Sequence, residues 1–150
     1  MNTNHLIDIK IGLLLWKTSN LWQSKLRNVL EEYNLTLNEF IILETLLMTK
    51  DENITQVYIS KSSGINVSVI STVIKILQKK SLIKRKSGLD SRIKIIELSE
   101  NGKILTKKIL PFINEVESNI FLKLGNEEIN FVNSMKLILG KKIRIKAEKK

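Results

Sequence analysis

The 150-residue sequence lacks cysteine and contains one proline, one histidine and six glycines. Without cysteine there is no disulfide, no thiolate metal ligand, no thiol nucleophile and no thiol redox sensor. The single histidine, His5, stands near the start of the chain with no metal-ligand pattern around it, so neither a metal site nor a histidine general base is expected. The glycines form no phosphate-binding loop. These absences argue against an enzyme and against any cofactor.

Long apolar runs are also missing. The most apolar stretch near the start, residues 6–16, is interrupted by Asp8 and Lys10 and is too short to span a bilayer. It also lacks the small-residue cleavage site of an export signal. We therefore expect a soluble cytoplasmic protein with no membrane partner.

Positive charge is what the sequence has in excess, with a formal net charge of +10. Residues 61–94 hold nine basic side chains against the single acid Asp90, a net +8, and residues 141–150 hold six against Glu148, a net +5. The rest of the chain is slightly acidic. The concentration of charge in residues 61–94 favours a surface that binds a polyanion. For the basic tail, a solvated end, a DNA-backbone contact and part of a dimer interface all stay open.

The first half of the chain shows helical spacing of apolar residues and clear capping signals. We predict a long helix over residues 4–33 that begins at Asn4, and a second helix that begins at a Thr36/Glu39 capping box. A short third helix is predicted after Thr55. A tight turn with Gly64 follows, and Asn66 is expected to cap a fourth helix that runs to about Lys80.

After Lys80 the apolar period changes. Residues 82–86 and 93–98 are predicted strands, joined by a turn at residues 87–91. Ser99 is expected to cap a fifth helix, which Pro111 should kink or interrupt. Asn126 is expected to cap a last helix after a break at Gly125, with Glu127 and Glu128 in its first turn. The fold class is therefore mainly α with one small β-hairpin.

Helix, tight turn, helix and hairpin occur in the order of a winged helix-turn-helix. The fourth helix has an apolar face and, opposite it, a face without acids that carries Ser68, Ser71, Thr72, Lys75 and Lys79. Hydroxyls can reach base edges or phosphates, and lysines neutralise phosphate. We therefore predict that this helix binds DNA. At its border, Val69 is expected to contact the protein or a thymine methyl group, and the basic first strand adds Lys84 and Lys86.

Three short motifs resemble the multiple-antibiotic-resistance regulator (MarR) family: the segment 77–83, Asp90-Ser91-Arg92, and Leu98-Ser99-x-x-Gly102. The resemblance covers nearly the whole chain. It implies a homodimer on double-stranded DNA, with the fourth helix in the major groove and Arg92 as the wing arginine that reaches the minor groove. Asp90 would then orient Arg92. The sequence departs from the family at Ser81, where glycine is usual, and in its short wing tip.

The predicted organisation is a single domain over residues 1–150. It comprises a winged helix-turn-helix at about 36–98, dimerisation helices at about 4–33 and 99–140, and the basic tail at 141–150. Trp16 and Trp22 are predicted in the dimer core or beside a small aromatic effector, since many members of the resembled family bind such ligands.

The predicted function is sequence-specific transcriptional regulation, with repression by a homodimer on a pseudo-palindromic site as the main hypothesis. One alternative is a winged-helix protein that binds nucleic acid without sequence preference. The other is a protein-interaction module that pairs with a related subunit.

Overall fold

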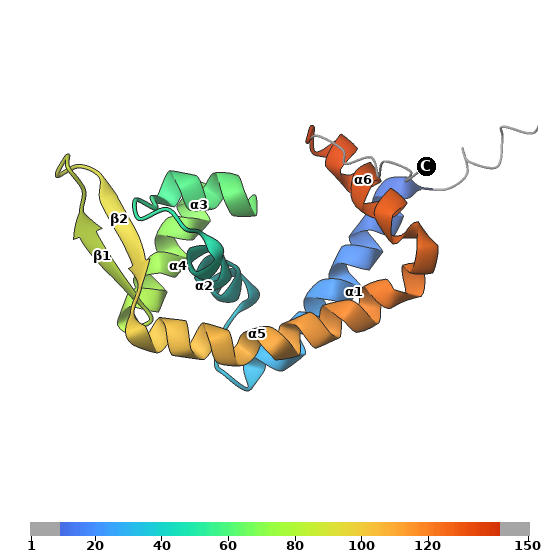
Figure 1. Cartoon of the computed structure of the whole chain (residues 1–150), viewed down its shortest axis with the longest axis horizontal. Helices are drawn as coiled ribbons and strands as arrows, with labels where there is room; N and C mark the ends of the chain where they lie inside the picture. The colour runs from blue at the N-terminus through green and yellow to red at the C-terminus, as the bar shows by residue number, and fades with distance from the viewer. Residues whose placement is uncertain (1–9, 142–150) are drawn as a thin grey trace, which may run out of the picture. The chain divides into compact units, whose positions relative to one another are not determined.

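A computed structural model describes residues 10–141 of the chain (Figure 1). In chain order, its elements are α1 (Ile11–Glu31), α2 (Leu37–Met48), α3 (Gln56–Ser63), α4 (Val67–Lys79), β1 (Ile83–Ser87), β2 (Lys94–Leu98), α5 (Glu100–Phe121), the 3-10 helix η2 (Leu122–Glu127) and α6 (Glu128–Ile138). The predicted fold class, mainly α with one antiparallel hairpin, is confirmed. The chain forms two compact units, residues 1–113 and 114–150, and each is described by itself.

The first unit is built around α2, α3 and α4, which lie together with the hairpin beside them (Figure 1). Phe40, Leu43, Ile59, Ile74 and Leu77 are fully buried between these helices. Full burial of such a side chain stabilises the fold by roughly 1.5–3 kcal/mol. The apolar face of α4 is therefore directed inward, and its polar face is left at the surface.

The predicted capping residues explain where the helices begin. The Thr36 hydroxyl accepts a hydrogen bond from the Glu39 amide, and the Glu39 carboxylate accepts one from the Thr36 amide at 2.7 Å. Thr55 caps α3, and Asn66 caps α4 by accepting from the Ser68 amide at 2.9 Å. All three predictions are confirmed.

The ends of α1 and α4 are closed in the same manner. At each end, a residue other than glycine takes the left-handed backbone conformation, Asn34 with φ +53° and Ser81 with φ +58°. The next amide then bonds back to the last turn, from Leu35 to Leu30 and from Leu82 to Leu77. Ser81 thus adopts the geometry for which glycine is usual, at some conformational cost.

The hairpin is fastened to α4 and α5 by the Leu98-Ser99-x-x-Gly102 motif. The Ser99 hydroxyl donates to the Ser81 carbonyl at 2.7 Å and accepts from the Gly102 amide at 2.9 Å, so Ser99 caps α5 as predicted. A Cβ atom on residue 102 would lie 2.0 Å from the Leu82 carbonyl oxygen, so only glycine fits there without a shift of the backbone. The motif therefore sets where the hairpin begins after α4.

Four local predictions differ from the structure. The strands are Ile83–Ser87 and Lys94–Leu98, each beginning one residue later than expected. α5 continues through Pro111 without interruption. Proline lacks the backbone N–H for one helical hydrogen bond, but Ile109 and Ile113 on either side of it are buried and stabilise the helix there. The predicted cap at Asn126 is wrong, since this residue lies within η2, where Gly125 has φ +53° and ψ −124°. α6 begins only at Glu128, so Glu127 precedes the first turn in which it was expected.

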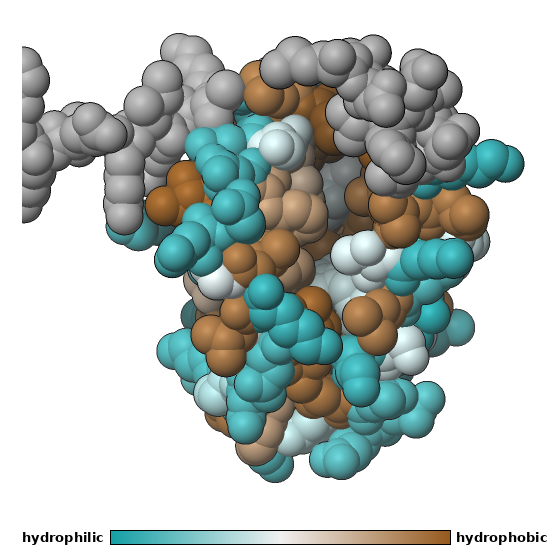
Figure 2. All heavy atoms as spheres, turned by 90° about the vertical axis from the view of Figure 1, so that its right-hand side faces the viewer, coloured by the Kyte–Doolittle hydropathy of each residue, from teal (hydrophilic) through white to brown (hydrophobic). Residues whose placement is uncertain are grey.

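Helices α1 and α6 each expose large apolar side chains. On α1 these are Ile11, Leu14, Leu15 and Trp16, and Figure 2 shows hydrophobic side chains at the surface on the side of the molecule where α1 begins. In the second unit, the rings of Phe121 and Phe131 pack with centroids 6.3 Å apart, while Leu137 and Ile138 are exposed. Among the described residues, no helix is long and apolar enough to cross a membrane.

Some predictions fall on residues 1–9 and 142–150, which lie outside the described part of the chain. They concern the Asn4 cap, the role of His5 and most of the basic tail.

Candidate nucleic-acid interface

The outward face of α4 carries the residues predicted to bind DNA. Ser68, Thr72, Lys75 and Lys79 are exposed, and Ser71 is half-buried at the edge of the face. At about 100° per residue these five side chains fall within an arc of roughly 100° on the helix. α4 has 13 residues, so it is about 20 Å long, enough to cross a major groove about 12 Å wide.

Two of the three hydroxyls on this face, those of Ser68 and Thr72, donate to groups at the start of the helix. Ser68 Oγ donates to the Asn66 side chain at 2.8 Å, and Thr72 Oγ1 donates to the Ser68 carbonyl at 3.3 Å. In this arrangement the exposed oxygens offer lone pairs, which suit the exocyclic amino groups of adenine and cytosine in the major groove. The first two turns of α4 therefore present acceptors, and the later turns present cations.

Adjacent lysines at the end of α4 have opposite environments. Lys79 is exposed and has no acidic partner within residues 10–141, and the same holds for Lys75. Lys80 instead lies with its Nζ 3.0 Å from Glu39 Oε1, and Glu39 is only 2% exposed. Lys80 therefore forms an ion pair with α2 within the protein. The nine basic side chains counted in residues 61–94 include Lys80, so fewer than nine are available at the surface.

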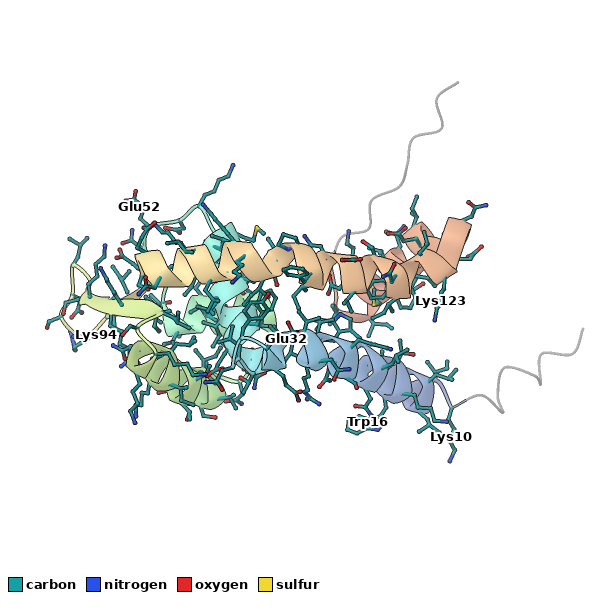
Figure 3. The ribbon with its side chains drawn as sticks, turned by 90° about the horizontal axis from the view of Figure 1, so that it is seen from below. Lys10, Trp16, Glu32, Glu52, Lys94 and Lys123 are labelled. Carbon is teal, nitrogen blue, oxygen red and sulfur yellow. The ribbon has the colours of Figure 1, made fainter. Side chains whose placement is uncertain are left out.

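The wing, residues 83–98, balances part of its own charge. Lys86 Nζ forms an ion pair with Glu97, and the register places Lys84 directly opposite Glu97 on the neighbouring strand. Lys94 donates to the Ser87 hydroxyl at 3.0 Å and lies on the hairpin in Figure 3. Lys84 itself is exposed. Sequence reasoning treated residues 61–94 as a block and so missed Glu97, three residues beyond it.

Arg92 and Asp90 interact at the wing tip as the motif predicts. The Asp90 carboxylate accepts from the Arg92 backbone amide at 2.9 Å and from the Arg92 Nε at 3.3 Å. These two hydrogen bonds, the backbone one first, lower the pKa of Asp90 below its usual 3.8. The Arg92 side chain is 90% exposed and is therefore available to a partner. Asp90 thus shapes the turn chiefly through the backbone and secondarily orients the guanidinium.

The two tryptophans are not brought together. Trp16 is 65% exposed and projects from α1 (Figure 3), whereas Trp22 is half-buried. A crevice nearby is lined by Asn28, Val29, Glu32, Tyr33 and Phe112, and by neither tryptophan. Their assignment to an effector pocket or a dimer core stays a prediction. In the described part of the chain, no cluster of His, Cys, Asp or Glu side chains could bind a metal ion.

Comparison with known sequences identifies a family. A family model described as "Transcriptional regulator SarA/Rot" matches residues 24–109, which include α2, α3, α4 and the hairpin. The HTH-type transcriptional regulator YdcH of Bacillus subtilis is 29% identical over 131 residues, covering 85% of this chain and 88% of YdcH.

Solved structures share the fold. The S. aureus MepR–DNA complex superposes with a TM-score of 0.82 at 22% identity, over 89% of this chain and 98% of MepR. A mutant MarR from E. coli in complex with operator DNA gives a TM-score of 0.76 at 16% identity, over 87% of this chain and 94% of MarR. The winged-helix fold predicted from the order of helices, turn and hairpin is confirmed by these matches.

Proposed function

Because the chain belongs to the SarA/Rot family of transcriptional regulators and has the winged-helix fold of MarR, we propose that it represses transcription as a cytoplasmic homodimer on specific double-stranded DNA. The family is one of transcriptional regulators, which agrees with the expectation that the chain is not an enzyme. What is proposed beyond the family is the sequence specificity, the homodimer and the direction of regulation.

The observation that carries the proposal is the acid-free outer face of α4. Hydroxyl acceptors lie on its first turns, and the lysines on its later turns have no acidic partner within residues 10–141. These match the two tasks of a recognition helix, reading bases and contacting phosphates. A surface that binds by charge alone does not require the hydroxyls, which can also reach base edges. We assign base contacts to Ser68, Ser71 and Thr72, and phosphate contacts to Lys75, Lys79 and Lys84.

On the wing we assign the minor-groove contact to Arg92, which is exposed and oriented by Asp90. Lys86 is proposed as a weaker phosphate contact, because Glu97 already neutralises it. An arginine suits a minor groove because the narrow groove concentrates negative potential.

The homodimer is supported by the apolar surfaces of α1 and α6. Leu14, Leu15 and Trp16 on α1, and Leu137 and Ile138 on α6, are all more than half exposed. Apolar surface of this extent normally marks an association site. A twofold dimer would place two copies of α4 on half-sites about 10 base pairs apart, so the proposed site is pseudo-palindromic.

The test is selection of bound fragments from randomised duplex DNA, followed by footprinting of the enriched fragment. We expect one inverted repeat and protection of two half-sites. Enrichment of no sequence, with an affinity that depends only on salt, would contradict the proposal and favour a non-specific nucleic-acid-binding protein. Absence of DNA binding at physiological salt would instead favour a protein-interaction module.

The proposed division of roles is tested by substitutions on α4 and the wing. Thr72→Ala should change which bases are preferred at one position of each half-site, at a cost of about 1–3 kcal/mol for the preferred sequence. Lys84→Ala should weaken binding to all sequences alike. If both variants changed affinity without changing preference, the assignment of base contacts to the hydroxyls would be wrong.

A further inference from the structure

Lys80 forms contacts between segments of the protein, although the preceding residue, Lys79, is exposed. Its Nζ lies 3.0 Å from Glu39 Oε1 and donates to Glu39 Oε2 at 3.1 Å and to the Asn34 carbonyl at 2.6 Å. Asn34, Glu39 and Lys80 belong to three different segments: the turn after α1, the first turn of α2 and the end of α4. One ammonium group therefore joins all three.

Two of the three segments that Lys80 joins are helix ends with a left-handed residue. Asn34 and Ser81 are the residues other than glycine with positive φ in the described chain, and Lys80 either bonds to or directly precedes each of them. Such conformations cost free energy and persist when surrounding contacts impose them. The Lys80 contacts are of that kind. The ammonium group binds the Asn34 carbonyl, and the same contacts fix Lys80 itself, which directly precedes Ser81.

The burial of Glu39 explains why a cation is needed at this position. Its carboxylate is 2% exposed and also accepts from the Thr36 amide at 2.7 Å, so it is fully desolvated at the start of α2. A buried carboxylate needs a cation in a defined place, and removal of one partner leaves the other uncompensated. Lys80 is the cation that meets this need, and its position fixes the last turn of α4 relative to α2.

On the proposed function, we propose that Lys80 is a positioning residue for DNA recognition. The Lys80 contacts with Glu39 and Asn34 set the angle at which α4 leaves the core and tie it to the end of α1. They act through the placement of the hydroxyl face and not through a contact with phosphate. Lys80 therefore determines how well a specific site is distinguished from other DNA.

The test compares Lys80→Met with Lys79→Met in the full-length chain, using the duplex recovered by selection and a mixed-sequence duplex of equal length. Lys80→Met should bind the selected duplex about tenfold more weakly, the equivalent of one lost base contact, and bind the mixed duplex about equally well. Its salt dependence should not change. Lys79→Met should weaken binding to both duplexes and lower the salt slope by about one.

A merely structural role would reduce the folded fraction of Lys80→Met and so lower both affinities by the same factor. Lys80→Arg, which retains the charge, should recover much of the specificity. Glu39→Gln removes the other partner, and its effect should not add to that of Lys80→Met if the two act as one unit. Glu39→Gln also serves as the second variant if Lys80→Met does not fold.

Two outcomes would overturn the inference. Equal losses on both duplexes, or no loss on either, would show that Lys80 does not position α4. Failure of the unsubstituted protein to enrich any duplex would overturn the proposed function itself. The two failures are distinguishable. The Lys80 variants are compared only with an unsubstituted chain that binds the selected duplex more tightly than the mixed one, so their failure leaves the proposed function intact.

Discussion

The recognition helix α4 carries two basic residues and the wing carries five, and the two regions hold them in different environments. On the outer face of α4, Lys75 and Lys79 are exposed without an acid nearby in the described chain. On the wing, Lys86 is paired with Glu97 and Arg92 with Asp90. The helix therefore offers its whole charge of +2 to a polyanion. The two acids of the wing, Asp90 and Glu97, reduce its five cations to a net +3 and hold two of them in a defined geometry.

This difference shows that the charge of a segment is not the charge it presents. Residues 61–94 have a formal net charge of +8, yet Lys80 is turned inward to Glu39 and Lys86 is neutralised from residue 97. Ion pairs at the surface contribute little to stability, typically about 0–1 kcal/mol, but they remove a cation from the set available to phosphate. We expect both lysines of α4 to contribute to electrostatic binding, whereas only part of the cations of the wing do so.

The largest effect is expected at Gly102 of α5, which lies against Leu82 at the junction between α4 and the wing. In Gly102→Ala the added Cβ would lie 2.0 Å from the Leu82 carbonyl oxygen, so the backbone at the base of the wing must move. We expect a loss of about 3 kcal/mol in the free energy of unfolding, measured by urea denaturation at fixed protein concentration. DNA affinity should fall as well, because the wing would no longer keep its position beside α4.

Gly12→Ala is the matched control, since a Cβ at that exposed position in α1 meets no atom within 4 Å. It should leave stability unchanged or raise it by about 0.5–1 kcal/mol, as alanine replaces glycine within a helix. Similar losses in both variants would show that the close approach at Leu82 is not the cause.

The second prediction tests whether the two lysines of α4 contribute to electrostatic binding. The double variant Lys75→Met/Lys79→Met should bind all DNA roughly tenfold more weakly near physiological salt, with a salt slope lower by about two. Binding is measured by fluorescence anisotropy over a range of salt concentrations. The control removes two exposed lysines outside α4 and the wing, Lys107 and Lys123, and should leave the slope unchanged. Equal slopes in the two double variants would contradict the assignment.

The sequence predicts those features that depend on near neighbours. The Thr36/Glu39 capping box, the Asn66 cap and the two faces of α4 are set by residues within four positions of one another, and the structure has them all. The inward turn of Lys80 depends on a carboxylate 41 residues away, and the start of α6 depends on the backbone of Gly125. No local pattern contains that information, so the sequence predicts the two faces of α4 but overestimates the charge that residues 61–94 present.

The third prediction concerns the wing, and here DNA affinity should rise where the two preceding predictions have it fall. Glu97→Gln frees Lys86 and removes a negative charge opposite Lys84, so DNA affinity should rise about two- to threefold with a small increase in salt slope. Glu115→Gln, at an exposed position of α5, is the control for the change in net charge. A decrease in affinity for Glu97→Gln would mean that the ion pair orders the wing for binding, so that its removal costs more than the released charge contributes.

The smallest effect concerns the geometry of the wing tip and is read from the titration of Asp90. Hydrogen bonds from Arg92 lower the pKa of this carboxyl below 3.8, so their contribution to the turn is complete above that value and is lost only as the pH falls through the lowered pKa. The wing tip should therefore keep one geometry from about pH 5 to pH 8.

Carbon-detected NMR should give a midpoint below 3.8 for Asp90. In Arg92→Ala the backbone amide remains, and it is the larger cause of the shift, so the midpoint should rise only part of the way toward 3.8. Full recovery would assign the shift to the guanidinium, and Asp90 would then act mainly on the side chain that we place in the minor groove.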